Sequence, residues 1–238
     1  MEAIIFVPCL VKLLKPEISE MMETILEKVS VDVVGRWDKW CCGQPFFNSG
    51  NWKSARYLAE KLLDELIDYQ YIISPSGSCI YTIKHHYMEL FKNNPTIQKR
   101  VAELSKKVYE FSDFLVSVCR YTDFGLKRFT TVAYHDSCQV KRGLGIYDQP
   151  RELLSNIEGL RLVDIPDSDR CCGFGGSFSF KYRDISMAIA DDKAKNIIES
   201  GAEILLGSEL SCLMNISIAL RRLGSDIRCM HLIEFLSC

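Results

Sequence analysis

The sequence predicts an α/β protein built from two tandem Rossmann-like modules with parallel sheets, related by internal duplication. Three observations support this. Short apolar runs such as residues 3–7 alternate with segments of helical periodicity, which is typical of parallel strands buried on both faces. One order of cysteines occurs twice along the chain. The length of 238 residues suits one large domain or two small ones.

In the first half we expect strands at 3–7, 31–34 and 71–74, and helices near 17–29, 53–68 and 78–91. The helix near 17–29 spaces its apolar residues along one face, and Pro16 suits its first turn.

In the second half we expect strands at 130–134, 160–164 and 203–206, and helices near 185–200 and 210–222. Gly201 suits a left-handed end to the first of these helices. Residues 92–118 are expected to add helices.

The duplication is clearest in the cysteines. Each half has a single cysteine, then an adjacent pair followed by glycine, then another single cysteine. The two sets are Cys9, Cys41, Cys42 and Cys79, and Cys138, Cys171, Cys172 and Cys212. Residues 108–115 also resemble residues 229–236. We therefore expect a first module at 1–120 and a second at 121–238.

Charge and hydropathy exclude several classes of protein. The formal net charge is −2 and the pI is near 6.1, so the chain has no basic excess for binding nucleic acid. No run of about 18–20 apolar residues predicts a membrane span. Glu2 stands where an export signal carries a base, so we expect a cytoplasmic protein with reduced thiols. Eleven cysteines then indicate metal binding or redox chemistry.

The repeated cysteines follow predicted strands. Because the carboxyl ends of parallel strands meet at one edge of a sheet, four thiols of each half are expected to converge there. Four thiolates suffice for a tetrahedral zinc ion or an iron–sulfur cluster. Adjacent cysteines favour a cluster, which offers separate iron atoms to neighbouring sulfurs. The alternative, that cysteines are small buried hydrophobes, suits the isolated Cys119, Cys229 and Cys238 better.

Polar residues surround the second set. His135 is a candidate catalytic proton carrier near neutral pH. Arg142 is a candidate for holding a carboxylate substrate through its planar fork, and Lys181 is a weaker one. The alternative is that His135 forms local hydrogen bonds and that both cations are solvated.

A set of short motifs covers the chain almost end to end and resembles a known family, the cysteine-rich CCG domain proteins. This domain occurs twice in the B subunit of heterodisulfide reductase and in the iron–sulfur subunit of glycolate oxidase. Within the family, the chain is most similar to the lactate-utilisation A type, which has this length and two such domains. The motifs are Phe6-Val7-Pro8-Cys9, Cys41-Cys42-Gly43-Gln44-Pro45, Pro75-Ser76-Gly77-Ser78-Cys79, Tyr134-His135-Asp136-Ser137-Cys138, Pro150-Arg151-Glu152-Leu153-Leu154, Cys171-Cys172-Gly173-Phe174-Gly175-Gly176 and Ser211-Cys212-Leu213-Met214-Asn215-Ile216.

The resemblance implies an iron–sulfur electron-transfer subunit of a system that oxidises L-lactate to pyruvate. It implies two partners: a B-type protein with ferredoxin-type cysteine motifs and a C-type subunit. A small 2-hydroxy acid is a further candidate ligand. The chain itself has no ferredoxin-type cysteine run, so electrons must pass through another subunit.

The chain departs from the family pattern in its thiol count. The full signature has five thiols per module, and here Ser76 and Glu209 replace one in each. Four remain, which suits one or two ordinary [4Fe–4S] clusters. The alternatives are zinc in one module, with a structural or assembly role, and thiol–disulfide chemistry of the heterodisulfide reductase type.

Overall fold

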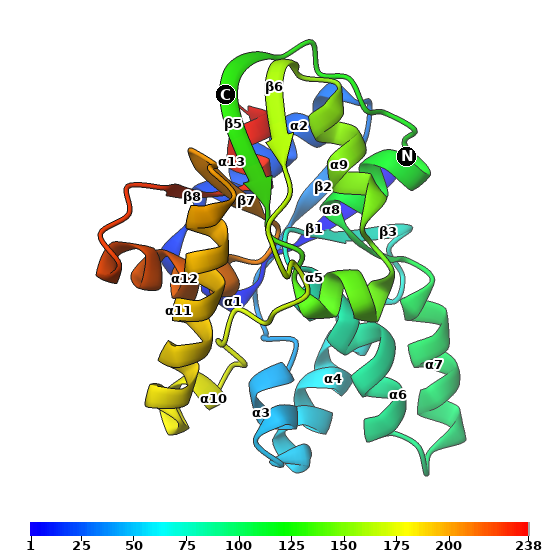
Figure 1. The fold of residues 1–238 in the computed structure, drawn as a ribbon. Coiled ribbons are helices and arrows are strands. Elements are labelled where there is room, and N and C mark those ends of the chain that lie inside the picture. Colours follow the sequence, from blue (N-terminus) through cyan, green and yellow to red (C-terminus); the bar gives the residue numbers. More distant parts are fainter. Residues whose placement is uncertain (238) are drawn as a thin grey trace. The chain divides into compact units, whose positions relative to one another are not determined.

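The structure is a computed structural model that describes residues 1–237. By its internal contacts the chain divides into two compact units, Met1–Phe114 (unit 1) and Leu115–Cys238 (unit 2), drawn in Figure 1. The module boundary that we expect at residues 120/121 stays a prediction, because compactness alone does not test independent folding.

Unit 1 is built on a four-stranded parallel sheet in the order β2-β1-β3-β4. Its strands are β1 (Glu2–Phe6), β2 (Asp32–Trp37), β3 (Tyr71–Ser74) and β4 (Val108–Glu110). The two strands in the middle, β1 and β3, are almost wholly buried. The parallel α/β prediction is therefore confirmed for this half.

Helices connect these strands. Right-handed crossovers place α2, which links β1 to β2, on the opposite face of the sheet from the helices between β2 and β4. The helices are α1 (Cys9–Leu14), α2 (Glu17–Lys28), α3 (Gln44–Asn48), α4 (Trp52–Leu66), α5 (Gly77–Tyr81), the π-helix η1 (Thr82–His86), α6 (Tyr87–Leu90), α7 (Pro95–Ser105) and α8 (Phe111–Asp113). Asn51 and Asn94 cap α4 and α7 by accepting hydrogen bonds from backbone N–H groups of the first turn.

Unit 2 repeats this topology. Its parallel sheet has the order β6-β5-β7-β8, with β5 (Lys127–Tyr134), β6 (Glu158–Val163), β7 (Ile204–Gly207) and β8 (Arg228–His231). Its long helices α11 (Arg183–Glu199) and α12 (Leu210–Arg222) pack side by side (Figure 1). The other helices are η3 (Gln139–Gly143), α9 (Asp148–Ser155), α10 (Phe178–Lys181) and α13 (Leu232–Ser237); the π-helix η2 (Phe114–Val118) starts at the boundary.

In each sheet the chain reverses direction at the same place. It leaves the first strand for the neighbour on one side, then returns to pair the third strand on the other side. The loops after β1 and β3 in unit 1 therefore run to opposite sides, as do those after β5 and β7 in unit 2. The point between such strands is a topological switch point. Crevices at such points are where open α/β sheets bind ligands.

The segment 92–118 is only partly helical. It contains α7, but residues 108–110 form the edge strand β4, where we expect helix. β8 is its counterpart in unit 2, and we do not expect it from the sequence. These strands have only three and four residues, too few for periodicity to reveal them.

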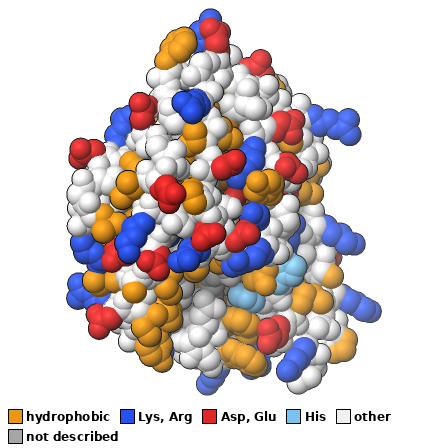
Figure 2. Space-filling view, viewed as in Figure 1, with side chains coloured by type: hydrophobic (Ala, Val, Ile, Leu, Met, Phe, Trp, Pro, Cys, Tyr) orange, Lys and Arg blue, Asp and Glu red, His pale blue; other side chains and the backbone are white. Residues whose placement is uncertain are grey.

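The surface is of mixed charge. Figure 2 shows basic and acidic side chains interspersed on the face in view, as expected for a net charge of −2. Within residues 1–237, no helix combines the length and apolar character needed to span a bilayer.

Candidate metal centres

Unit 1 brings its four predicted thiols together at the carboxyl edge of the sheet. Cys9 begins α1 directly after β1, Cys41 and Cys42 lie in the loop after β2, and Cys79 lies in α5 just after β3. The Sγ atoms of Cys9 and Cys41 are 3.7 Å apart. Cys42 is in side-chain contact with both Cys41 and Cys79, so the thiols form a continuous cluster.

Unit 2 forms the corresponding cluster at the equivalent positions, after its strands β5, β6 and β7. Cys138 follows β5, Cys171 and Cys172 lie in the loop after β6, and Cys212 lies in the first turn of α12. The Sγ atoms of Cys172 and Cys212 are 2.8 Å apart. Cys171 is in side-chain contact with Cys138 and Cys172. We call these clusters quartet 1 and quartet 2.

The loop of each cysteine pair is fixed in the same way. The following glycines, Gly43 and Gly173, have φ values of +85° and +81°, the left-handed conformation that glycine adopts without strain. Their N–H groups each donate to the sulfur two residues earlier, at 3.4 Å. The glycines thus turn the backbone N–H towards the first thiol of each pair.

A side chain from a helix also holds the carbonyl oxygen of each pair's second cysteine. The Tyr87 hydroxyl donates to the Cys42 oxygen at 2.9 Å, and the Asn215 amide donates to the Cys172 oxygen at 2.8 Å. Neither residue is among the predicted site residues. Asn215 lies in a sequence motif quoted for the family resemblance, whereas no sequence pattern indicates Tyr87.

Each quartet has a buried and an open side. Cys42, Cys79, Cys172 and Cys212 are buried, whereas Cys9 and Cys171 are exposed and Cys41 and Cys138 are half-buried. A group bound to a quartet would contact two buried sulfurs on its inner side. Its outer side would remain accessible.

The thiols shift one another's pKa values. Contact with Cys41 and burial raise the pKa of Cys9, and contact with Cys42 raises the pKa of Cys41 to about 11. Hydrogen bonds from Cys138 and Cys172 lower the pKa of Cys171 to about 2. Close thiols cannot all ionise unaided, because like charges repel. A bound cation would offset that repulsion, since metal ions take thiolates as ligands.

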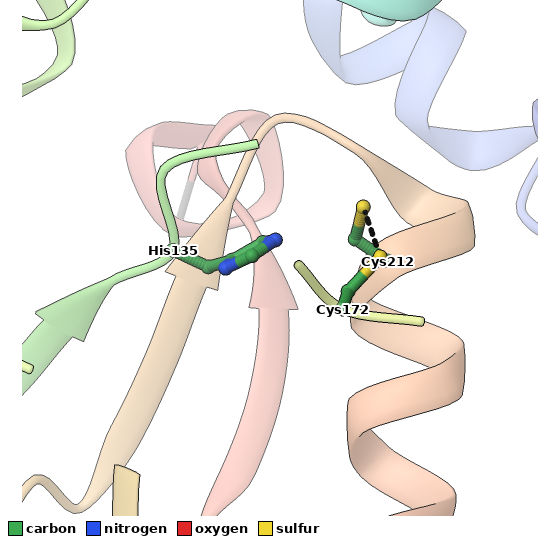
Figure 3. Close-up of side chains that lie close together, drawn as sticks. All are labelled: His135, Cys172 and Cys212. Carbon is green, nitrogen blue, oxygen red and sulfur yellow. Dashed lines mark hydrogen bonds between the residues drawn. The ribbon is translucent and has the colours of Figure 1, made fainter. Parts of the chain in front are cut away.

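Quartet 2 has buried polar neighbours. His135, Asp136 and Ser137 precede Cys138 and are almost completely buried. Asp136 accepts two hydrogen bonds of 2.8 Å from the guanidinium of Arg151. Figure 3 shows the His135 side chain near those of Cys172 and Cys212.

Arg142 does not form the planar fork that we consider from the sequence. Its side chain is exposed and donates to the backbone oxygen of Asp169 at 3.1 Å. The forked interaction belongs to Arg151, and its partner is a carboxylate of the protein itself. Arg151 also lines a cavity of about 240 Å³, but Asp136 already neutralises its charge there. Lys181 is exposed.

Lys193 of α11 is a buried cation that is not among the predicted site residues. Its side chain is 0% exposed, and its ammonium group donates to the Ser168 oxygen at 2.7 Å. Burial lowers its pKa. One sequence feature indicates it: a lysine stands on the helix face whose other buried residues are Ser186, Ala190, Ala194 and Ile197.

Beside quartet 1, one glutamate holds the loop that leads to the cysteine pair. Trp37 is buried just before the pair, and its indole N–H donates to Glu65, as does that of Trp40. Lys39 and these two indoles lower the pKa of Glu65 to about 2. Glu65 therefore fastens three residues of the loop that leads to the cysteine pair.

The isolated cysteines are placed apart. Cys229 lies in β8, and Cys119 follows η2. Burial raises the pKa of each to about 11. Cys238 lies outside the described residues.

The donors suit a soft metal centre. Quartet 1 consists of four thiols, and quartet 2 has one imidazole within 4.8 Å of two of its sulfurs. Thiolates select zinc or iron–sulfur clusters rather than magnesium or calcium. By donor chemistry, each quartet is thus a candidate centre for such a metal. In quartet 2 the geometry adds support, because one His135 nitrogen and the Sγ atoms of Cys172 and Cys212 lie within 4.8 Å of one another.

Two copies of a cysteine-rich fold with thiol clusters at the sheet edge define a class of protein. The profile of the cysteine-rich domain (CCG) family matches the chain twice, at residues 3–84 and 132–217. The matches contain all eight clustered cysteines. The chain belongs to the cysteine-rich CCG domain family, in the group that includes lactate utilization protein A.

That protein from Bacillus cereus (strain G9842) is 37% identical to this chain over 237 residues, which cover 100% of this chain and 99% of the relative. Lactate utilization protein A from Bacillus cytotoxicus and from Bacillus thuringiensis (strain Al Hakam) match with the same identity and coverage.

Among solved structures, a hypothetical protein from Helicobacter pylori aligns with a TM-score of 0.67 at 13% identity. The alignment covers 98% of this chain and 48% of that one. At this identity, the similarity concerns the fold alone.

Proposed function

We propose that this chain is an iron–sulfur electron-transfer subunit of a system that oxidises lactate to pyruvate. The observation that carries the proposal is the convergence of four thiols from three separate loops in each unit. The lactate assignment is supported by the 37% identity, over the full chain, to proteins named for lactate utilisation.

Cys9, Cys41, Cys42 and Cys79 would hold one group, and Cys138, Cys171, Cys172 and Cys212 the other. A cluster of the [4Fe–4S] type supplies one-electron transfer when bound. The protein keeps two sulfurs of each quartet away from water and fixes the loop of each pair through Gly43 or Gly173. The exposed thiols Cys9 and Cys171 leave an outer side through which a redox partner can exchange electrons.

The chain needs partners for this function. Removing two electrons and two protons from lactate requires an onward acceptor, and no ferredoxin-type cysteine run occurs in this sequence. We propose a B-type iron–sulfur protein with such motifs as that acceptor, together with a C-type subunit. The site of the 2-hydroxy acid is left to the assembled complex, because Arg142 and Arg151 are both engaged by the protein itself.

The test is analysis of iron, acid-labile sulfide and zinc in protein purified anaerobically. We expect iron and sulfide in both units. Cys79→Ser and Cys212→Ser should each lower the iron content by about half, because each removes a buried ligand from one quartet. Cys119→Ser is the matched control and should leave iron unchanged. Equal iron loss in all three variants would contradict the ligand assignment.

A second candidate is a zinc-bearing structural or assembly subunit. It is favoured by the mixed donor set of His135, Cys172 and Cys212, since zinc commonly takes histidine and cysteine together. Colourless protein with stoichiometric zinc and no sulfide would support it against the iron–sulfur proposal.

A further inference from the structure

The two units differ at one equivalent position, at the carboxyl end of the first strand of each sheet. In unit 1, Ile5 of β1 pairs with Ile73, and in unit 2, Tyr134 of β5 pairs with Leu206. These pairs are equivalent, so the next residue is Phe6 in unit 1 and His135 in unit 2. Both are buried. Phe6 packs against Trp37, whereas His135 carries two nitrogen atoms into the same position.

The His135 ring lies within reach of two thiols. One ring nitrogen and the Sγ atoms of Cys172 and Cys212 all lie within 4.8 Å of one another (Figure 3). Ligands at zinc–sulfur and zinc–nitrogen bond lengths around one tetrahedral ion would be about 3.5–3.8 Å apart. Shifts of about 1 Å or less in the side chains would therefore bring all three atoms onto one metal.

The His135 ring interacts with the side chain of Cys212, one of the two thiols within its reach. Both ring nitrogens are buried, and among residues 1–237 neither has a partner at ordinary hydrogen-bond distance. Leaving a buried polar atom unsatisfied costs about 1–3 kcal/mol. A ligand bond to one nitrogen removes that cost for the atom involved.

We propose that His135 is a nitrogen ligand of the metal centre in unit 2. Unit 2 then holds its metal through sulfur and one imidazole, whereas unit 1 holds its metal through sulfur alone. The inference rests on the proposed function only in requiring metal at quartet 2. It gives His135 a ligand role in place of the proton-carrier role considered from the sequence. Two chemically different centres follow within one duplicated chain.

The experiment uses the full chain, purified anaerobically after growth with ¹⁵N-histidine or with unlabelled histidine. Pulsed electron paramagnetic resonance is recorded on the reduced iron centres or, where analysis finds zinc, after exchange for paramagnetic Co²⁺. We expect hyperfine coupling to one histidine nitrogen, with the isotope change in the labelled sample. His135→Phe, which copies unit 1, should abolish the coupling while the thiols keep the metal.

His85→Phe is the matched control, because His85 is exposed and lies in unit 1; its coupling should equal that of the wild type. His135→Gln replaces His135→Phe if the latter does not fold. Metal present at quartet 2 without histidine coupling in the wild-type protein would overturn the ligand role and leave the proposed function standing. Absence of metal from quartet 2 would overturn both.

Discussion

The glycine after each cysteine pair has less space around it in unit 2 than in unit 1. A Cβ atom added to Gly173 would lie 2.6 Å from the Ser186 carbonyl oxygen, whereas one on Gly43 would lie 3.5 Å from the Ala55 oxygen. Both glycines are left-handed. The backbone conformation therefore demands glycine at both positions, and the space demands it only in unit 2.

We therefore expect Gly173→Ala to lower the free energy of unfolding by about 3 kcal/mol, combining the left-handed strain with overpacking. Gly43→Ala should cost about 1 kcal/mol, from backbone strain alone. Urea denaturation of metal-free, reduced protein measures both. Equal losses would show that the contact with Ser186 is relieved by a shift of the helix.

Asp136 and Arg151 form a forked ion pair in unit 2 whose carboxylate is buried. The Asp136 side chain is 1% exposed and receives both donors of the fork. Asp136→Asn should lower the free energy of unfolding by about 3 kcal/mol, because the guanidinium loses its charged partner.

Asp64→Asn serves as the control for that measurement. Asp64 pairs with Arg100 at 2.7 Å, but both side chains are exposed. Its replacement should cost less than about 1 kcal/mol in the same denaturation experiment. A cost for Asp136→Asn no larger than that of Asp64→Asn would contradict the importance of burial.

At the scale of elements, the end of the fourth strand is stabilised differently in the two sheets. In unit 1, Glu110 accepts hydrogen bonds from the N–H groups of Ser112 and Asp113 at 2.8 and 3.2 Å. In unit 2, the Nδ1 atom of His231 accepts from the Ile233 N–H group at 3.2 Å. A carboxylate in unit 1 and an imidazole in unit 2 thus accept hydrogen bonds from the backbone of the equivalent turn.

Glu110 makes unit 1 sensitive to pH. Burial raises its pKa from 4.5 to about 7, against the effect of its hydrogen bonds. The folded state therefore prefers the neutral acid, and its contribution to stability is complete below pH 4.5 and is lost as the pH rises through about 7. The loss should approach about 3 kcal/mol between pH 4 and pH 8.

Urea denaturation across that range measures the effect. Glu110→Gln should remove this decline with rising pH while the contributions of the other acids remain. An unchanged pH dependence in the variant would contradict the assignment to Glu110.

The longer helices and the buried strands were predictable because their patterns are local, whereas short helices such as α1 and α3 were not predicted. The helix expected at 17–29 is α2, and Ile18, Met22 and Leu26 are buried along its predicted face. Gly201 has the expected left-handed conformation, with φ +71°. The edge strands β4 and β8 were not predictable, because only pairing with β3 and β7 distinguishes such short segments from loops.

The same distinction applies to the sites. The eight clustered cysteines stand out because spacing repeats in sequence, and topology then brings them together. His135 stands out by its neighbours, but its orphaned nitrogens appear only in three dimensions. Lys193 is indicated only by the break that it makes in the buried face of α11, and Tyr87 by no sequence pattern. The partner of each is visible only in three dimensions, because each contacts a loop far away along the chain.

At the scale of the whole molecule, the units share a topology but differ in charge beside the quartets. Gly43 approaches Ala55 and Gly173 approaches Ser186, which aligns α4 with α11. In that alignment the buried Lys193 corresponds to the buried Leu62. Unit 2 therefore carries an internal cation where unit 1 carries an apolar side chain.

This difference should separate the reduction potentials of two bound clusters. A nearby positive charge favours the reduced form, because reduction adds negative charge. Lys193→Leu should lower the midpoint potential of the unit 2 centre by tens of millivolts and leave the unit 1 centre unchanged. Redox titration followed by electron paramagnetic resonance measures this. The exposed Lys195→Leu is the control.

The carbonyl oxygens of Cys42 and Cys172 are held by different side chains in the two units. One is held by a tyrosine that follows the last cysteine of its set by eight positions, and the other by an asparagine that follows by three. Two equivalent loops thus reach the same restraint from different helix positions with unrelated side chains. Each cysteine pair can therefore lose this anchor by a substitution that leaves the other pair untouched.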